Sequence, residues 1–274
     1  MSKYAYLNLG CGATFNKDWT NVDFVSSSEY VKAHNLLDGI PFADAQFDVV
    51  YHSHVLEHFP KEKVVEFIKE CYRVLKPGGI IRVAIPDLER IVLNYIRYLN
   101  ESLEGIKGAE QKYDWSMLEL FDQVVRSKTG GGMIEYIKDT SNNNDAFLIE
   151  RNGQEVERLM KMFRGGPDPS YTSKYSGSSR IKELFSRIRR KLISILLGKE
   201  YGLYRTGKFR SEGEIHQWMY DRYSLKRLLE NNGFKNAGVK VMFDSAVPDW
   251  KSFDLDGKDG ILRKPDSLFM EAVK

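Results

Sequence analysis

Two glycines and a carboxylate near the start of the chain have the spacing of a nucleoside-binding turn. The apolar run Tyr4–Leu9 ends in Gly10–Gly12, and Asp23 lies at the end of the next strand-like run. Glycine lets a backbone approach a ligand closely and adopt positive φ values, and a carboxylate can accept hydrogen bonds from both hydroxyls of a ribose. Ligands of open parallel sheets bind beyond the carboxyl ends of the strands. We therefore expect a nucleoside at this turn.

The same turn does not fit a dinucleotide. The dinucleotide fingerprint has a third glycine where this chain has Phe15, and its acidic residue lies about 20 residues further on, whereas Asp23 follows sooner. A nucleoside without phosphates fits the spacing better. An enzyme that uses NAD or a nucleotide sugar is the weaker alternative.

Three side chains are candidate general bases for a group-transfer reaction. His54 follows the apolar strand run Phe47–Tyr51. Asp87 follows the next strand run, where it could equally cap a helix. His216 comes late in the chain, in a segment that could either return over the site or pack in the core. On a helix, His216 and Tyr220 would share one face.

The histidines near His54 also raise the question of a metal site. His52 and His54 share one face of a strand, and His58 follows closely, but no cysteine or acidic spacing completes a ligand set. We therefore expect no metal ion. Cys11 has no base near it in the sequence, so we expect it to pack in the core and not to act as a nucleophile.

Strand and helix signals alternate over the first hundred residues, which predicts a parallel sheet flanked by helices. Helical stretches separated by loops follow, and strand signals return near the end. We expect one α/β sheet domain made of residues 1–103 and 211–274, with a largely helical insertion of residues 104–210 for the acceptor substrate. The predicted strands are Tyr4–Leu9, Thr20–Phe24, Val31–Leu37, Phe47–Tyr51, Ile80–Ile85, Ala237–Phe243 and Ser267–Val273; the predicted helices include Pro60–Leu75, Leu88–Leu103 and Asp221–Asn231; and the loops of the insertion are Gly130–Gly132, Ser141–Asp145 and Gly165–Ser179.

Taken together, the N-terminal runs resemble the class I S-adenosylmethionine-dependent methyltransferases. The likeness covers about residues 4–90 well, and 214–240 and 267–273 loosely. It is carried by Leu7–Gly12, Asn21–Asp23, Leu36–Phe42, Phe47–His58 and Arg73–Gly79. The runs Ser53–His58 and Arg73–Gly79 are similar to a bacterial branch often found with cell-surface glycan genes.

The resemblance implies a Rossmann-like, mostly parallel seven-stranded sheet with an antiparallel last strand, and S-adenosyl-L-methionine as cofactor. It implies methyl transfer to a small molecule or a glycan, including a lipid-linked sugar. Asn8, Thr14 and Asn35 depart from the family pattern, and they motivate an alternative, a non-catalytic, membrane-associated cofactor-binding or assembly protein. The implied cofactor-binding residues are Asn8, Gly10, Cys11, Gly12, Asp23, Phe24, Asn35, Leu36 and Ser53.

Charge is concentrated in one segment of a chain whose formal net charge is only +3. Residues 180–210 hold ten Lys/Arg and two Asp/Glu, and apolar residues recur at helical spacing through 180–198. A basic amphipathic helix can lie on an anionic membrane, or it can be a lid helix with a solvated face. No nucleic-acid-binding motif accompanies it.

The composition favours a protein of the cytoplasm or of the inner face of a membrane. No apolar run is long enough to span a bilayer, and no secretory leader is recognisable at the start. Two cysteines in 274 residues favour reduced thiols over a disulfide framework.

Overall fold

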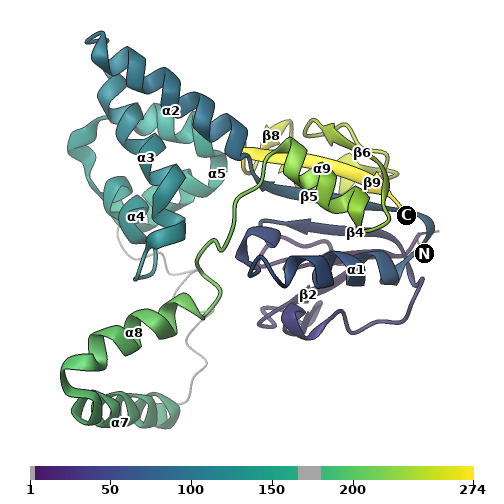
Figure 1. The fold of residues 1–274 in the computed structure, drawn as a ribbon, viewed down its shortest axis with the longest axis horizontal. Coiled ribbons are helices and arrows are strands. Elements are labelled where there is room, and N and C mark those ends of the chain that lie inside the picture. Colours follow the sequence, from purple (N-terminus) through teal and green to yellow (C-terminus); the bar gives the residue numbers. More distant parts are fainter. Residues whose placement is uncertain (1–3, 166–179) are drawn as a thin grey trace.

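A computed structural model describes residues 4–165 and 180–274 of the chain. Seven strands form one mixed sheet in the order β3-β2-β1-β4-β5-β9-β6 (Figure 1). Strands β3, β2, β1, β4 and β5 are parallel, and β9 runs antiparallel to β5 and β6. The predicted fold class, a mostly parallel Rossmann-like sheet with an antiparallel last strand, is confirmed. The strands are β1 (Tyr6–Leu9), β2 (Thr20–Asp23), β3 (Val31–Ala33), β4 (Phe47–Ser53), β5 (Leu75–Pro86), β6 (Lys235–Lys240) and β9 (Ser267–Val273), and β7 (Gly257–Lys258) and β8 (Ile261–Leu262) form a separate hairpin.

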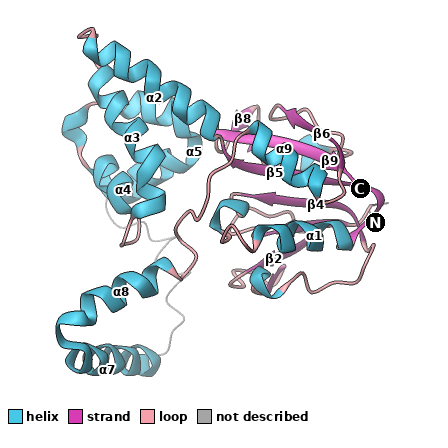
Figure 2. Ribbon diagram, viewed as in Figure 1, coloured by secondary structure: helices cyan, strands magenta, loops and turns pink. Residues whose placement is uncertain are grey.

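Two amphipathic helices, α1 (Val64–Val74) and α9 (Arg222–Asn231), cover one face of the sheet (Figure 2). The buried residues of α1 fall at helical spacing, which puts them on one stripe. Asp221 caps α9 by accepting a hydrogen bond from the Ser224 amide at 2.7 Å. The largest core cluster lies between these helices and the sheet, so the apolar stripes fix which side of the sheet each helix covers.

The opposite face lacks a helix between β1 and β2, because residues 10–19 contain only turns and unpaired chain. An aromatic cluster takes its place. Trp19 stacks on Tyr6 at 4.7 Å between ring centroids, and it meets Trp250 edge-on at 6.0 Å. Trp250 belongs to a 3-10 helix, η5 (Trp250–Phe253), in the connection between β6 and β9. A late segment of the chain therefore covers the face that a crossover helix would otherwise cover.

A buried ion-pair network anchors this connection to the sheet. Arg82 of β5 is fully buried and contacts both Asp256 and Glu271 at 2.6 Å. Its guanidinium also lies 4.6 Å from the ring centroid of Trp250, and the Tyr51 hydroxyl donates to Asp256 at 2.7 Å. Because a buried charge is tolerated only when it is paired, these contacts depend on one another.

Beyond the sheet, four helices form a bundle with a core of its own around Trp115 (Figure 1). After it, α7 and α8 form a hairpin that projects away from the sheet and meets the bundle at the end of α8, where Arg210 donates to the Val124 carbonyl at 3.2 Å. In the described part of the chain, no helix has both the length and the apolar character that a bilayer-spanning segment needs. The bundle consists of α2 (Leu88–Leu103), α3 (Ala109–Val125), α4 (Gly131–Lys138) and α5 (Asp145–Arg164), and the hairpin consists of α7 (Arg180–Leu197) and α8 (Tyr201–Arg210), joined by η4 (Gly198–Glu200).

The observed elements differ from the predicted ones at several ends. The predicted strand Val31–Leu37 stops at Ala33, because Asn35 caps a 3-10 helix, η1 (Leu36–Asp38). The predicted strand Ala237–Phe243 ends at Lys240, where a turn begins. Helix α2, predicted as part of the sheet domain, packs along α3. The predicted loop Gly165–Ser179 falls almost wholly outside the described residues. The remaining short elements are η2 (Leu56–His58) and η3 (Thr140–Asn142).

Candidate active site

The topological switch point of the sheet lies between β1 and β4. These strands are adjacent and parallel, with Leu9 opposite His52. From β1 the chain builds outward through β2 and β3, and from β4 it builds in the other direction through β5. Open sheets bind ligands in the crevice at such a point. The turn Gly10–Gly12 and the residues that end β4 therefore share one crevice.

The Asp23 carboxylate, at the end of β2, is hydrogen-bonded to the glycine turn beside this crevice. Gly10 and Gly12 both have positive φ, 62° and 54°. A Cβ atom on Gly10 would lie 2.3 Å from a methyl of Val55, whereas one on Gly12 would meet nothing within 4 Å. The Gly12 amide donates to a carboxylate oxygen of Asp23 at 2.7 Å, and the Val25 amide donates to the other oxygen at 3.3 Å. The carboxylate is thus held at the mouth of an open turn, with lone pairs left to accept ligand hydroxyls.

Two of the predicted cofactor-binding residues hold the backbone in place. Asn8 is buried and donates to the Thr14 carbonyl and to Asn21 Oδ1, both at 3.3 Å. Asn35 accepts a hydrogen bond from the Leu37 amide at 3.1 Å. The Asn8 contacts tie the loop after β1 to the neighbouring strand, and the Asn35 contact begins η1, so both side chains shape the loops that follow the strands.

The other predicted cofactor-binding residues differ in exposure. Phe24, beside Asp23, is 72% exposed. Leu36 packs partly against the main core, and Ser53 ends β4 half-buried. Cys11 is buried, and burial, followed by the charge of Asp23, raises the pKa of its thiol to about 12. A thiol with that pKa stays protonated at neutral pH and is not a nucleophile.

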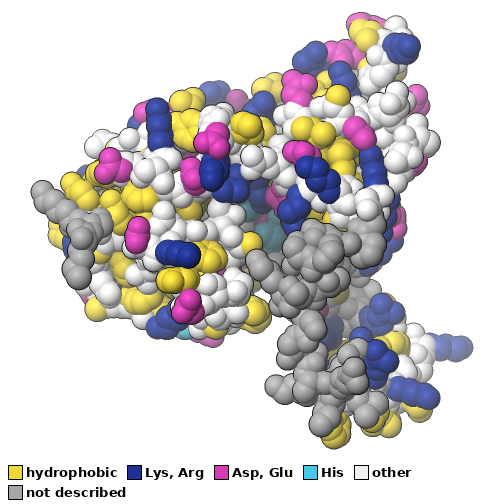
Figure 3. All heavy atoms as spheres, turned by 180° about the vertical axis from the view of Figure 1, so that it is seen from behind, with side chains coloured by type: hydrophobic (Ala, Val, Ile, Leu, Met, Phe, Trp, Pro, Cys, Tyr) yellow, Lys and Arg dark blue, Asp and Glu magenta, His cyan; other side chains and the backbone are white. Residues whose placement is uncertain are grey.

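A cavity of about 320 Å³ lies beside the crevice, between the end of the sheet and the helical bundle. His54, His58 and His216 line it on the sheet side, and Glu119 and Asn152 line it on the bundle side. Figure 3 shows histidine atoms within the hollow between the two parts of the molecule. The structure therefore brings two of the three candidate bases, His54 and His216, into one cavity.

His54 is held in a strained and fixed orientation. Its backbone has φ +53°, a left-handed conformation that is uncommon for residues other than glycine. Its Nε2 lies 2.8 Å from the hydroxyl oxygen of Ser267, and its Nδ1 lies 3.2 Å from Glu57 Oε1. Backbone strain of this kind clusters at functional sites. Here the left-handed backbone positions the His54 imidazole between the end of β4 and the start of β9.

Glu57 and His216 are both buried beside His54. Burial opposes the charge on Glu57, but its contact with His54 and the neighbouring imidazoles outweigh burial and lower the pKa of Glu57 to about 2. Burial lowers the pKa of His216 to about 3, so its imidazole is neutral at neutral pH. His216 lies outside any helix or strand, and its amide donates to the Gln123 carbonyl at 2.9 Å.

Asp87 is placed differently from the two histidines. Its carboxylate accepts the Arg90 amide at 3.3 Å and caps α2, and burial raises its pKa. Asp87 is not among the residues that line the cavity. The structure therefore shows the helix cap that was one of its two predicted roles, and its part in catalysis stays a prediction.

A buried polar network on the bundle side was missed from the sequence. Glu119 of α3 lies 3.2 Å from Arg151 and accepts from Asn152 at 3.1 Å. Asn152 also donates to Asp266 at 3.3 Å. Burial raises the pKa of Glu119 to about 7, despite the opposing charge of Arg151. The available signal was Glu119 lying four residues after Trp115, on the apolar side of α3.

The fold and the turn at the switch point define an α/β protein with a nucleoside-type crevice. Residues 7–83 match the family model described as Methyltransferase domain. Over 54 residues, the chain is 41% identical to a probable S-adenosylmethionine-dependent methyltransferase of Mycolicibacterium smegmatis, covering 20% of each protein. Over 108 residues it is 32% identical to a probable methyltransferase of Aspergillus luteorubrus, covering 35% of this chain and 37% of that one. The family match therefore covers the part of the sheet that holds the glycine turn and Asp23.

These likenesses cover only parts of the proteins compared. The chain spans 20% of the first relative's length and 37% of the second's. A solved S-adenosylmethionine-dependent methyltransferase of Thermotoga maritima, described as a possible histamine N-methyltransferase, aligns over 100% of this chain and 84% of its own, with 11% identity and a TM-score of 0.38.

Proposed function

We propose that the chain is an S-adenosylmethionine-dependent methyltransferase that methylates a hydroxyl-rich acceptor of the glycan class, carried on a lipid. The observation that carries the proposal is the Asp23 carboxylate, held 2.7 Å from the Gly12 amide at the switch point. The matched methyltransferase domain and the resemblance to a glycan-associated branch support the same assignment.

The residues around the crevice fit this cofactor. Asp23 would accept the ribose hydroxyls, because its carboxylate already faces the turn. The turn Gly10–Gly12 would lie along the methionine part, since the space beside Gly12 is open. Phe24 would rest against the adenine, because most of its ring is exposed next to Asp23. When bound, S-adenosylmethionine supplies a methyl group activated by its sulfonium.

The neighbouring cavity suits an acceptor with several hydroxyls. Glu119, Asn152 and Asp266 offer acceptors and a donor on the bundle side, and His54 and His216 offer imidazoles on the sheet side. Glu119, whose pKa is about 7, can hold the proton that an acceptor hydroxyl releases. The bundle helices cover the cavity and limit the entry of water.

The hairpin α7–α8 supports a lipid-linked acceptor. Its exposed apolar side chains recur along one face of α7, and Figure 3 shows Lys and Arg gathered on the same part of the molecule. A helix with an apolar face and a basic flank binds the interface of anionic membranes. The side chains of Ile181 and Leu184 lie outside what the structure describes. The exposed apolar residues are Phe185, Ile188, Leu192, Ile195 and Leu196 of α7 and Leu203 of α8.

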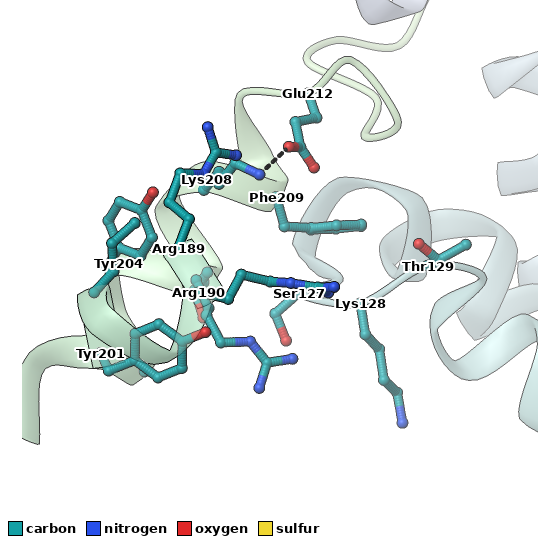
Figure 4. A pocket seen from close by; sticks show the side chains of 14 residues that line it. Ser127, Lys128, Thr129, Arg189, Arg190, Tyr201, Tyr204, Lys208, Phe209 and Glu212 are labelled. Atoms are coloured by element: carbon teal, nitrogen blue, oxygen red, sulfur yellow. Dashed lines mark ion pairs between the residues drawn. The ribbon is translucent and has the colours of Figure 1, made fainter. Parts of the chain in front are cut away.

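A second cavity, of about 550 Å³, lies between this hairpin and residues 127–129 (Figure 4). Arg189, Arg190 and Lys128 line it together with the rings of Tyr201 and Tyr204. No residue of the switch point contributes to it, so it is not a cofactor site. Its basic lining is suited to the phosphate of an anionic lipid, which supports a membrane contact at the hairpin.

Calorimetry with S-adenosylmethionine and with its demethylated product tests the cofactor site. We expect both to bind, and we expect Asp23→Ala to weaken binding by about tenfold or more, the loss of one charge-assisted contact. Asp18→Ala, which removes an exposed carboxylate of the same loop region, is the matched control and should bind normally. If neither compound binds the intact chain, the proposal is wrong.

Labelled cofactor tests the acceptor. The purified chain is incubated with the cofactor and with the lipid and aqueous fractions of a bacterial extract. We expect label in the glycolipid fraction, and mild acid that splits lipid-linked sugars should release it with the sugar. Label only in aqueous small molecules would refute the lipid-linked acceptor, and cofactor binding without any label transfer would favour the non-catalytic alternative.

A further inference from the structure

We propose that Glu57, His58 and His216 bind one divalent transition-metal ion, of the zinc type, in the wall of the acceptor cavity. One possible ligand atom from each side chain lies within 4.8 Å of the other two. His58 and His216 both line the cavity. Three nitrogen and oxygen ligands with one side open to a pocket are the donor set of catalytic zinc sites.

The two segments that carry these ligands are fastened to each other. Glu57 and His58 belong to η2, and His216 comes from the chain after α8. The Gln217 amide donates to the Glu57 carbonyl at 2.7 Å. The His58 and His216 rings meet edge to face, with 4.8 Å between their centroids. The cluster is therefore set by backbone contacts and does not depend on the chance positions of surface side chains.

The Glu57 carboxylate is the second and independent sign of a ligand. It is 1% exposed, and neither of its oxygens has an aligned hydrogen-bond donor among the described residues. His54 Nδ1 comes within ion-pair distance of one oxygen, at 3.2 Å, and leaves the other without a partner. Buried carboxylates are normally paired or coordinate a metal, so a cation beside Glu57 would satisfy the group.

His58 is already oriented as a metal ligand. Its Nδ1 lies 3.1 Å from the Ile215 carbonyl, to which it can only donate. That contact keeps the proton on Nδ1 and leaves the lone pair of Nε2 free. A ligating histidine almost always donates its other ring N–H to a carbonyl or carboxylate in this way.

The donor set selects the kind of ion. Mg²⁺ and Ca²⁺ prefer oxygen ligands, whereas two imidazoles and one carboxylate suit Zn²⁺ and its neighbours Fe²⁺, Co²⁺ and Ni²⁺. Bonds of about 2.1 Å in a tetrahedral site place ligand atoms about 3.4 Å apart. The present separations of up to 4.8 Å therefore require the side chains to close slightly around the ion.

The role of such an ion rests on the proposed function. At the open coordination position it would bind the acceptor hydroxyl and lower its proton affinity. The hydroxyl oxygen would then bond to the methyl carbon as the sulfur–carbon bond breaks, with the electron pair of that bond going to sulfur. Glu119, which lines the same cavity, would take the hydroxyl proton. No oxidant or reductant is needed.

Metal binding is measured directly on the full chain, independently of activity. The protein is stripped with a chelator and titrated with Zn²⁺ by calorimetry and with Co²⁺ by visible absorption. We expect one ion per chain and the intense d–d bands of a low-coordinate Co²⁺ site. Glu57→Gln and His216→Ala should each weaken Zn²⁺ binding by about a hundredfold or more, because even outer contacts of a metal site contribute about 10–100-fold.

His34→Ala is the matched control, because His34 lies outside the cluster and contacts the Gly39 carbonyl. It should bind Zn²⁺ as the natural chain does. His58→Asn, checked for folding by circular dichroism, provides a third loss variant should His216→Ala not fold. Stoichiometric Zn²⁺ binding that is unchanged by all three cluster variants, or no binding to the natural chain, overturns the proposal.

Calorimetry with S-adenosylmethionine on the stripped protein separates this inference from the proposed function. Cofactor binding without metal binding rejects only the metal site. Metal binding without cofactor binding rejects the methyltransferase assignment but still supports the metal site.

Discussion

Alanine at Gly10 and alanine at Gly12 make a matched test of how the glycine turn is built. Both positions have positive φ, 62° and 54°, so both substitutions carry a backbone cost of about 1–2 kcal/mol. Only at Gly10 does the new Cβ meet an obstacle, a methyl of Val55 at 2.3 Å. Overpacking of this kind adds about 1–3 kcal/mol. Gly10→Ala should therefore lower the free energy of unfolding by about 2–5 kcal/mol, and Gly12→Ala by about 1–2 kcal/mol.

Val55→Ala turns this difference into a coupling measurement. Removing the two methyl groups of Val55 relieves the contact with Gly10→Ala but does not touch position 12. The double-mutant cycle of positions 10 and 55 should show a favourable interaction of about 1–3 kcal/mol, and the cycle of positions 12 and 55 should be additive within about 0.5 kcal/mol.

Urea denaturation of the five variants, followed by tryptophan fluorescence, gives the free energies. Calorimetry with S-adenosylmethionine on the folded variants shows whether the turn keeps its shape. Equal destabilisation by the two glycine substitutions, with no coupling between positions 10 and 55, would show that β1 and β4 do not meet as described.

Three further predictions follow from buried groups and from the hairpin. Arg82→Met leaves the buried charges of Asp256 and Glu271 without a cation, so it should lower the free energy of unfolding by about 3–5 kcal/mol in denaturant titrations; a cost below about 1 kcal/mol would contradict the network. The pKa of Glu119 is about 7 in the folded chain, above its ordinary value of 4.5. Between these two pH values the folded chain keeps a proton on Glu119 that the unfolded chain has lost. The protonated Glu119 therefore contributes fully to the free energy of unfolding below pH 4.5, and this contribution is lost as the pH rises through 7. If Glu119 is the base, the rate of methyl transfer should rise as the pH rises through 7. Glu119→Gln should abolish the pH dependence of both the rate and the stability near pH 7. A pH–rate profile that is unchanged in Glu119→Gln would refute the role of Glu119 as base. Leu196→Glu, on an 83% exposed side chain, should reduce co-sedimentation with anionic vesicles without changing the unfolding midpoint, whereas binding equal to that of the natural chain would exclude α7 as the membrane contact.

The elements near the crevice were predictable because their signals are local. Tyr4–Leu9 is apolar and is followed by glycine, and Asp23 closes the next strand-like run, so a few neighbouring residues predict the strand, the turn and the carboxylate. The stripe of α1 and the capping residue of α9 are equally local. The ends of β3 and β6 were missed because capping and turns decide them, and a capping amide such as that of Asn35 looks like any polar residue in a strand run.

The cluster of Glu57, His58 and His216 could not be predicted from local sequence patterns. No acidic partner was assigned to the histidines near His54, although Glu57 lies beside His58 in the sequence. On a regular strand those neighbours would point to opposite faces, whereas η2 and the returning chain at His216 bring their ligand atoms within 4.8 Å.

By itself the sequence determined the class of sheet, the glycine turn, the carboxylate at Asp23 and the basic character of residues 180–210. Tertiary structure alone decided that Trp250 would replace a crossover helix, that Glu119 would reach the acceptor cavity, and that His216 would meet Glu57. The physical reason is the distance along the sequence over which each effect acts. Side-chain periodicity and turn chemistry act over a few residues, whereas burial and charge pairing join positions that only the packed chain brings together.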